Sequence, residues 1–269
     1  MKRILLSLSM IVFVGAVVIG ATGAFFSDTE VSTGNTFTAG AIDLTVDSKQ
    51  HYNGMVCVLG EQSSTGTWQP EDGTKPPFYP AEDSPCVGTW EATDLGVQQF
   101  FNFADIKPGD SGENTVSLHV LNNDAWLRMI IKDVTDLDNT CTEPEQGTNG
   151  EACTVGTPEG SNAGMGELRE NLLFTVFSDN GDDDNKCNNI LDGDENTLIS
   201  SGTVDSLGET WPLPTPITGG QTVCFGITWD LPSTVGNETQ TDSMGATMEF
   251  EVVQSRNNPT PWPFTPSTP

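Results

Sequence analysis

The chain has 269 residues, with 38 acidic and 10 basic side chains and a formal net charge of −28. This charge excludes ordinary nucleic-acid binding, which requires a basic face to displace counterions, and it argues against adhesion to anionic lipid head groups. A surface this acidic repels its own copies unless cations screen it. Self-association therefore requires strong contacts or a medium rich in salt or calcium.

The first 24 residues are typical of a secretory signal peptide. Lys2 and Arg3 precede an apolar run over 4–21, and small residues lead to Ala24. We expect a signal peptidase to cut between Ala24 and Phe25, so that the remainder is secreted and meets the membrane only before cleavage. The alternative is a retained transmembrane anchor, because about 18 apolar residues can just span a bilayer.

After this segment the sequence lacks sustained helical periodicity and holds many short runs of β type. In one run Val116, Leu118 and Val120 fall on one face and His119 on the other, which is the period of a half-buried strand. Gly, Pro, Asn and Asp clusters separate the runs. Strands are predicted over 41–46, 97–103, 114–121, 127–134, 172–178, 223–229 and 246–253, with a short helix over 167–171. The pattern predicts an all-β fold, an antiparallel jelly-roll-like β-sandwich with long loop insertions.

This sandwich domain is predicted over 41–256, and three stretches depart from its rhythm. Residues 47–92 are rich in Gly, Pro, Ser and Thr and are predicted to form a long insertion. Residues 136–166 are predicted to form a second insertion, an acidic loop. Residues 257–269 are rich in proline and are predicted to be an extended tail.

Six cysteines follow the signal peptide. An even number of cysteines in an oxidising compartment indicates disulfides, although the sequence leaves their connectivity open. Pairing of nearest neighbours gives Cys57–Cys86, Cys141–Cys153 and Cys187–Cys224. The chain has no CxxC motif and no Cys/His cluster with zinc spacing, so a structural zinc site of that type is not expected.

Acidic residues interleaved with Asn and Gly fill the segment 177–195. Calcium prefers many hard oxygen ligands, and this spacing can wrap one ion. The segment does not match an EF-hand, because Lys186 falls where that loop needs an oxygen ligand. The alternative is a solvated acidic loop. The candidate calcium ligands are Asp179, Asp182, Asp183, Asp184, Asp192 and Asp194.

Catalytic motifs are missing from the sequence. Its two histidines, His51 and His119, are far apart, and neither HExxH nor a nucleophile or phosphate-loop motif occurs. We therefore expect no enzyme activity, and we expect His119 on the surface of a strand. Asn237 begins an Asn-Glu-Thr sequon and is a candidate glycosylation site in an exported loop.

Several motifs in order resemble the TasA/camelysin family of secreted proteins, whose leaders are cut by a SipW-type signal peptidase. They are an aromatic start at Phe25, the segment FTAGAIDL at 37–44, the turn IKPGD at 106–110 followed by LNN at 121–123, and a late strand ending in Gln254. The resemblance covers the two ends and the early middle of the mature chain. The cysteines and the insertion at 47–92 depart from the simplest members.

The resemblance implies a jelly-roll subunit of biofilm-matrix fibres or of archaeal bundling pili, in which the N-terminal segment of one subunit completes the sheet of the next. Residues 25–40 would be this donor strand, and a second copy of the chain would be the partner in a head-to-tail homopolymer. The donor residues would be Phe25, Phe26, Val31 and Phe37, which lie on a polar segment with no core of its own. Beside an open sheet edge, such a segment gains backbone hydrogen bonds, and a heterologous contact of this kind propagates into a filament.

Three alternatives remain open. The N-terminal segment can be the first strand of its own domain, or disordered. The whole protein can be a monomeric cell-surface binding module that uses the loops 47–92 and 136–166. Camelysin-like members are also described as secreted metallopeptidases, although the sequence shows no ligand set to support that activity.

Overall fold

The computed structural model describes most of the chain after the leader, in ten segments. The described residues are 27–31, 42–60, 65–73, 79–146, 155, 166–181, 186–193, 195–204, 210–259 and 261–262. The predicted signal peptide and its cleavage site therefore lie outside the described residues. Within the described part, no helix is long and apolar enough to cross a membrane.

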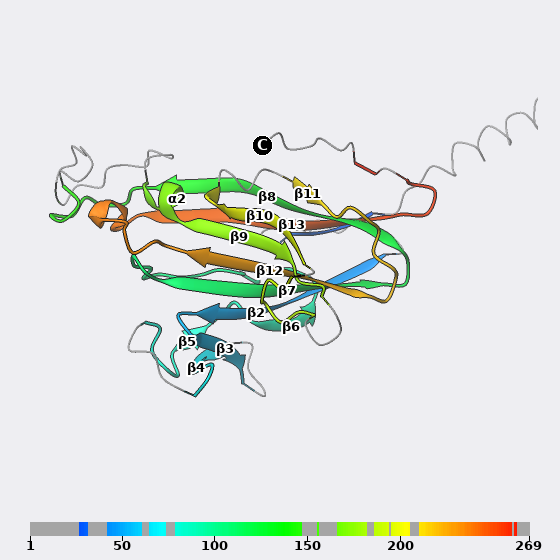
Figure 1. Ribbon diagram of the computed structural model, residues 1–269, viewed down its shortest axis with the longest axis horizontal. Helices are drawn as coiled ribbons and strands as arrows, with labels where there is room; N and C mark the ends of the chain where they lie inside the picture. The colour runs from blue at the N-terminus through cyan, green and yellow to red at the C-terminus, as the bar shows by residue number, and fades with distance from the viewer. Residues whose placement is uncertain are drawn as a thin grey trace, which may run out of the picture.

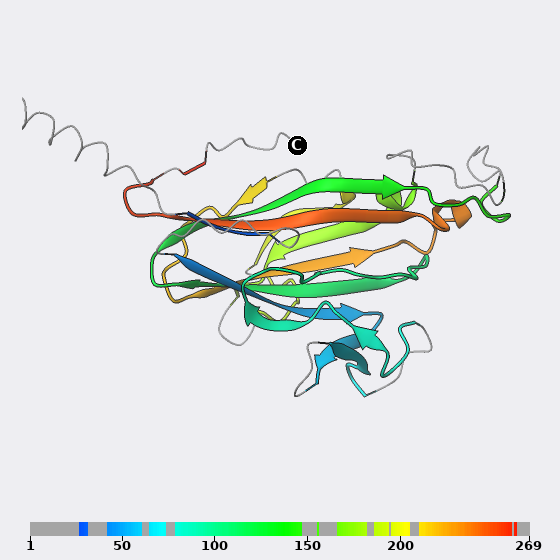
Figure 2. The ribbon, with the colours of Figure 1, turned by 180° about the vertical axis from the view of Figure 1, so that it is seen from behind.

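The described strands form two antiparallel sheets (Figures 1 and 2). The four-stranded sheet has the order β1 (Ser27–Val31), β13 (Ser243–Gln254), β8 (Ala125–Leu137), β11 (Thr210–Pro212). The nine-stranded sheet has the order β10 (Asn196–Gly202), β9 (Leu173–Ser178), β12 (Thr222–Asp230), β7 (Ser111–Leu121), β2 (Asp43–Tyr52), β3 (Met55–Leu59), β4 (Gly66–Pro70), β5 (Pro85–Cys86), and β6 (Trp90–Thr93) also pairs with β2. The predicted all-β, antiparallel sandwich is confirmed, and its jelly-roll connectivity stays a prediction.

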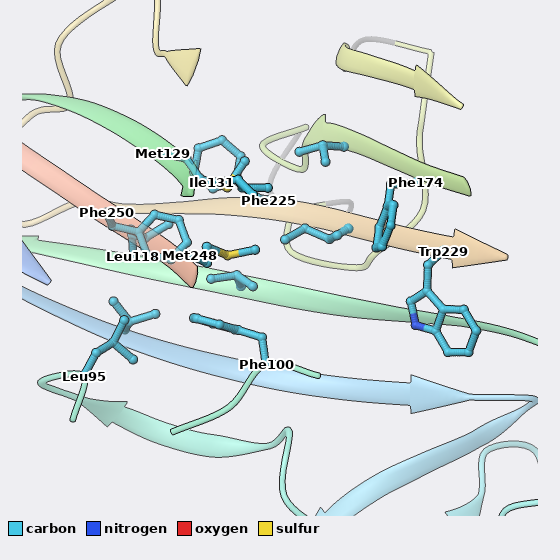
Figure 3. Packing of buried hydrophobic residues seen from close by; sticks show 14 of the residues in the cluster. Leu95, Phe100, Leu118, Met129, Ile131, Phe174, Phe225, Trp229, Met248 and Phe250 are labelled. Atoms are coloured by element: carbon cyan, nitrogen blue, oxygen red, sulfur yellow. The ribbon is translucent and has the colours of Figure 1, made fainter. Parts of the chain in front are cut away.

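The core lies between the two sheets and is built by alternating apolar residues. Val116, Leu118 and Val120 of β7 are fully buried, as their period of two predicts. They share one cluster with Met129 of β8 and Phe250 of β13 from the other sheet, and Figure 3 shows side chains of both sheets meeting there. Removal of this apolar surface from water is the main force that holds the layers together.

The strands predicted around 114–121, 127–134, 172–178, 223–229 and 246–253 are present as β7, β8, β9, β12 and β13. The predicted helix is present as α2 (Leu168–Asn171), and a 3₁₀ turn, η2, covers Asn237–Thr239. The strands are generally longer than predicted, because polar residues at their ends continue the backbone ladder.

The strand predicted over 97–103 is wrong, and the segment is a loop. Phe100 is buried, but its carbonyl accepts hydrogen bonds from two side chains, Gln50 Nε2 at 2.8 Å and Asn114 Nδ2 at 2.9 Å. These buried amides come from β2 and β7 and hold the loop across the sheet. Two individual side chains therefore hold this aromatic-rich segment, which does not form the strand ladder that was predicted.

The insertion predicted over 47–92 begins later than expected. β2 continues through Tyr52, so residues 47–52 belong to the centre of the nine-stranded sheet, where they pair with β7. The remainder forms β3, β4, β5 and β6, which extend the sheet and project beyond β2 in Figure 1. The second insertion likewise begins after β8 ends at Leu137, and much of it lies outside the described residues.

Two predicted disulfides are confirmed. Cys57–Cys86 joins β3 to β5 within the first insertion, and Cys187–Cys224 ties the acidic loop to β12. Cys141 is also disulfide-bonded, while Cys153 lies outside the described residues. Each confirmed bond closes a long loop and so restricts the unfolded chain.

The Lys-Pro-Gly-Asp turn is organised by the carboxylate of Asp110. It accepts hydrogen bonds from the hydroxyl of Tyr52 (2.8 Å), from Asn53 Nδ2 (2.8 Å) and from the backbone NH of Lys107 (2.8 Å). Gly109 has φ +96°, a value that favours glycine. Burial and the nearby Asp110 raise the pKa of Tyr52, which keeps its hydroxyl protonated as the donor. The turn is thereby fixed to the end of β2.

The start of the predicted tail contacts the four-stranded sheet. Trp126 Nε1 donates a hydrogen bond to the carbonyl of Asn258 (2.7 Å), and the Arg128 guanidinium lies 4.8 Å from the ring centre of Trp262. A cation over an aromatic face is an attractive contact. In its described part, the tail predicted from 257 contains no strand, and its residues Asn258 and Trp262 contact side chains of β8.

Candidate functional site

The N-terminal strand β1 lies at the edge of the four-stranded sheet, beside β13 of the same chain. Five residue pairs join the two strands, from Ser27 opposite Val253 to Val31 opposite Glu249. In the single chain, residues 27–31 are thus an edge strand of their own domain, which is the alternative that the sequence left open. The predicted donor residues Phe25, Phe26 and Phe37 lie outside the described residues, whereas Val31 is the last residue of β1.

β13 is longer than the strand that covers it. β1 pairs with residues 249–253 of a strand that begins at Ser243. In the described part of the chain, no strand lies beside residues 243–246 on that side. Unpaired backbone groups at a sheet edge are a template on which another strand can add.

An apolar groove of about 1090 Å³ borders this same part of β13. Residues 242–248 form one side and the loop 98–108 forms another. Its inner surface consists of core side chains, among them Phe174, Trp229 and Met248, which Figure 3 shows in the space between the strands. The open edge and the groove therefore lie along the same part of β13, and an open edge of this kind is where an extended segment can add to a sheet.

The described acidic residues of the 177–195 segment hold the loop's own backbone. Asp179 is fully buried, and its two oxygens accept the NH groups of Asn188 (3.2 Å) and Asn189 (2.7 Å). Burial raises the pKa of Asp179, and these hydrogen bonds oppose the rise. Asp192 accepts a hydrogen bond from the Asn188 side chain (3.1 Å). Asp182, Asp183, Asp184 and Asp194 lie outside the described residues, so the calcium site stays a prediction.

A cluster that the sequence did not indicate lies at the end of β2. His51 Nδ1 is 3.3 Å from a carboxylate oxygen of Glu113 on β7, and His51 Nε2 is 3.6 Å from Glu71, just after β4. His51 and Glu113 stand directly opposite each other in the antiparallel register. Burial lowers the pKa of His51 against the opposing effect of Glu71, and burial raises the pKa of Glu113.

A second cluster contains only carboxylates. Asp138, Glu145 and Asp242 bring one oxygen each within 4.8 Å of one another. Burial raises the pKa of Asp242 to about 7, the neighbouring Asp138 and Glu145 add to the rise, and the backbone NH groups of Leu168 and Glu167 oppose it. The Leu168 NH donates to Asp242 Oδ2 at 2.9 Å. Asp242 therefore fixes the start of α2, although its carboxyl group lies beside two other acidic groups that disfavour its charged form.

The two remaining sites predicted from sequence are on the surface. His119 lies half-buried on β7, with Nε2 2.6 Å from Asp47 and Nδ1 2.9 Å from the hydroxyl of Thr222. Its position on the strand surface is as predicted. Asn237 is exposed at the start of η2, so the side chain of the sequon is accessible.

Sequence reasoning missed the His51 cluster because its members are far apart in the chain. The signal that was available is the alternating pattern of β2 and β7, but only the register places position 51 opposite position 113. Glu71 arrives through the insertion, whose path the sequence did not indicate.

Comparison of the chain with family models, with curated proteins and with solved structures found no match. The fold and these sites define the protein as a disulfide-bonded, acidic, antiparallel β-sandwich. Its membership of the TasA/camelysin family stays a prediction from the motifs.

Proposed function

We propose that this protein is a secreted structural subunit of extracellular filaments, a biofilm-matrix fibre or a bundling pilus, that polymerises by donating its N-terminal strand to the next copy. The observation that carries the proposal is the position of β1 at the sheet edge, held to β13 by a backbone ladder. The same residues from a neighbouring copy can make the same ladder. Exchange of an identical element between copies is a low-cost route to association.

The length of the connection supports exchange. Residues 32–42 separate β1 from β2, and a fully extended chain spans at most about 3.6 Å per residue, so these eleven residues reach about 40 Å at most. That reach is comparable to the length of a small domain, so the strand can lie beside its own β13 or extend to a neighbour. If a donated strand keeps the register of β1 and continues along β13, Phe37 would fall opposite Ser243 and fill the groove beside residues 242–248, which β1 of the single chain does not cover. Phe25 and Phe26 would lie at the other end of β13, beyond Val253.

Charge sets the conditions for assembly. With a net charge of −28, neighbouring subunits repel each other, and salt or divalent cations screen that repulsion. A SipW-type signal peptidase would release the mature chain, and filaments would form outside the cell, where disulfides persist. Calcium bound at the acidic loop would favour lateral bundling.

The first test is negative-stain electron microscopy of residues 25–269, with and without millimolar calcium, beside a variant that lacks 25–31. We expect filaments from the longer chain and monomers from the shorter one. A variant that lacks 263–269 is the matched control and should still form filaments. Filaments that persist without 25–31 would contradict strand donation.

A cross-linking test identifies the donor directly. Thr29 stands opposite Glu251 in the β1–β13 register, so we would mix two single variants, Thr29→Cys and Glu251→Cys, and oxidise them. Strand exchange predicts disulfide-linked dimers between the two kinds of chain. The double variant, oxidised at high dilution, should lock β1 to its own β13 and form no filaments until it is reduced. Persistent monomers in every condition would favour the alternative, a monomeric cell-surface binding module.

A further inference from the structure

The His51 cluster joins three separate parts of the chain. His51 lies near the end of β2, Glu113 near the start of β7, and Glu71 follows β4 in the insertion closed by Cys57–Cys86. One nitrogen or oxygen atom from each residue lies within 4.8 Å of the others. An imidazole nitrogen and two carboxylate oxygens are ligands that zinc and similar divalent transition metals accept.

The His51 side chain is buried without a hydrogen bond. His51 is 6% exposed, and both of its ring nitrogens are buried with no hydrogen-bond partner. Their distances to Glu113 and Glu71, 3.3 and 3.6 Å, exceed those of an ordinary N–H···O bond, about 2.7–3.2 Å. A polar group buried without a partner costs about 1–3 kcal/mol, so an unpaired histidine here needs a compensating ligand.

Asn189 adds a second buried polar group at the same place. It is 5% exposed, and neither amide atom has a partner within hydrogen-bond geometry. The Asn189 side chain is nevertheless close enough to Glu113 to lower the pKa of that carboxyl. Asn189 lies in the loop closed by Cys187–Cys224, and Glu71 lies in the loop closed by Cys57–Cys86. Each of these two loops therefore places a polar side chain beside Glu113.

From this geometry we propose that His51, Glu71 and Glu113 bind one divalent transition metal ion, with zinc as the representative. One ring nitrogen of His51 and the two carboxylates are the ligands, and the partly exposed side of the cluster, where the Glu71 side chain is 55% accessible, admits water as a further ligand. Calcium does not fit this set, because it requires more oxygen ligands and does not favour imidazole. The ion would fasten the insertion to the centre of the nine-stranded sheet.

This proposal is independent of strand donation, since none of the three residues lies in β1 or β13. The competing explanation is an ion triad, in which a doubly protonated His51 bridges two glutamates without metal. The two explanations differ in what zinc does: a bound ion adds stability in proportion to the logarithm of its concentration, whereas a triad does not respond.

The test is isothermal titration of the metal-free mature protein with zinc chloride, combined with thermal unfolding. We expect one zinc ion per chain and a rise in Tm on zinc addition. Glu71→Gln changes an exposed loop residue and should leave the fold intact while it weakens zinc binding at least tenfold, and His51→Gln should do the same or more. His119→Gln, which alters the other histidine beside Asp47, is the matched control and should bind zinc like the unchanged chain.

Two results would overturn the proposal. One is the absence of a saturable zinc site in the unchanged chain, with the nuclear magnetic resonance signals of the His51 ring unmoved by zinc. The other is zinc binding that both Glu71→Gln and His51→Gln leave unchanged, which would place the ion on other carboxylates of this acidic surface.

Discussion

The centre of the nine-stranded sheet and the edge of the four-stranded sheet are held in different ways. At the centre, β2 and β7 pair over ten residues without a break, and the side chains of Gln50, Asn114 and Asp110 bind the adjoining loops. At the edge, β1 is joined to β13 by five backbone pairs. The contacts at the centre depend on particular side chains of the same chain. The backbone ladder at the edge does not depend on particular side chains, so another copy can make it equally well.

The largest effect should follow from Asp110→Ala at the centre. This change removes the acceptor of three hydrogen bonds and leaves the buried hydroxyl of Tyr52 with only a long contact to Asp105 O, at 3.4 Å. Hydrogen bonds to charged groups contribute more than neutral ones, so we expect a loss of about 3 kcal/mol in the free energy of unfolding. Urea denaturation measures the change. Asp105→Ala, an exposed aspartate of the same turn, should cost about 0.5 kcal/mol or less, and an equal loss in both variants would contradict this role of Asp110.

Asn114→Ala should cost about 2 kcal/mol, because Asn114 is fully buried and donates to Ser48 Oγ (3.0 Å) and to the carbonyl of Phe100 (2.9 Å). The change removes one of the two anchors of the loop 98–108. Urea denaturation again gives the magnitude, and limited proteolysis of this loop should become faster. The control is Asn102→Ala in the same loop, where the side chain is exposed. A loop that resists protease in Asn114→Ala would show that Gln50 alone holds it.

Asp242→Asn should change how stability depends on pH. The pKa of Asp242 is raised to about 7 in the folded chain, against about 3.9 when unfolded. Below pH 4 both states are protonated and nothing is lost. Between pH 4 and 7 the unfolded chain ionises first, so the free energy of unfolding falls as pH rises.

Asparagine removes this penalty and keeps an acceptor for the Leu168 NH. The variant should therefore match the unchanged protein near pH 4 and exceed it at pH 8 by about 1 kcal/mol, less than the full shift implies because Asp242 is partly exposed. Urea denaturation at the two pH values measures the difference. Asp94→Asn, at an exposed position, should show no such dependence. A variant less stable at pH 8 would mean that the carboxylate is needed in its charged form.

The smallest effect should come from Glu251→Gln on β13, near the edge. Arg128 Nε donates to Glu251 Oε2 at 2.6 Å across the β8–β13 pair. Partly exposed ion pairs contribute about 0.5 kcal/mol, and salt screens them. Thermal unfolding in low and high salt should show a small difference that shrinks in high salt. A loss as large as that of Asp110→Ala would remove the contrast between the two regions.

Strands with a regular alternation were predictable, and loops anchored by single side chains were not. Residues 114–121 and 172–178 carry the pattern of half-buried strands, and both lie in strands. Residues 97–103 carry three phenylalanines and were also predicted to be a strand, but they form a loop. The difference lies in Gln50 and Asn114, whose side chains take the Phe100 carbonyl that a strand would have paired.

The same division holds for the candidate sites. Pairing of nearest neighbours in the sequence predicted Cys57–Cys86 and Cys187–Cys224, whose cysteines are 29 and 37 residues apart. The predicted acidic loop was found to use Asp179 for its own backbone. The His51 cluster depends on a cross-strand register and on the path of an insertion, neither of which local sequence encodes.

The sequence by itself determined the fold class, the strong negative charge and the longer strands β2, β7, β8, β9, β12 and β13, because alternation and composition are local properties of the chain. Tertiary structure alone decided that β1 pairs with β13, that the loop 98–108 borders a groove, and that His51 meets Glu71 and Glu113. These arrangements arise from long-range pairing. A shift of one residue in register would turn His51 or Glu113 to the opposite face of its strand, and the cluster would not exist.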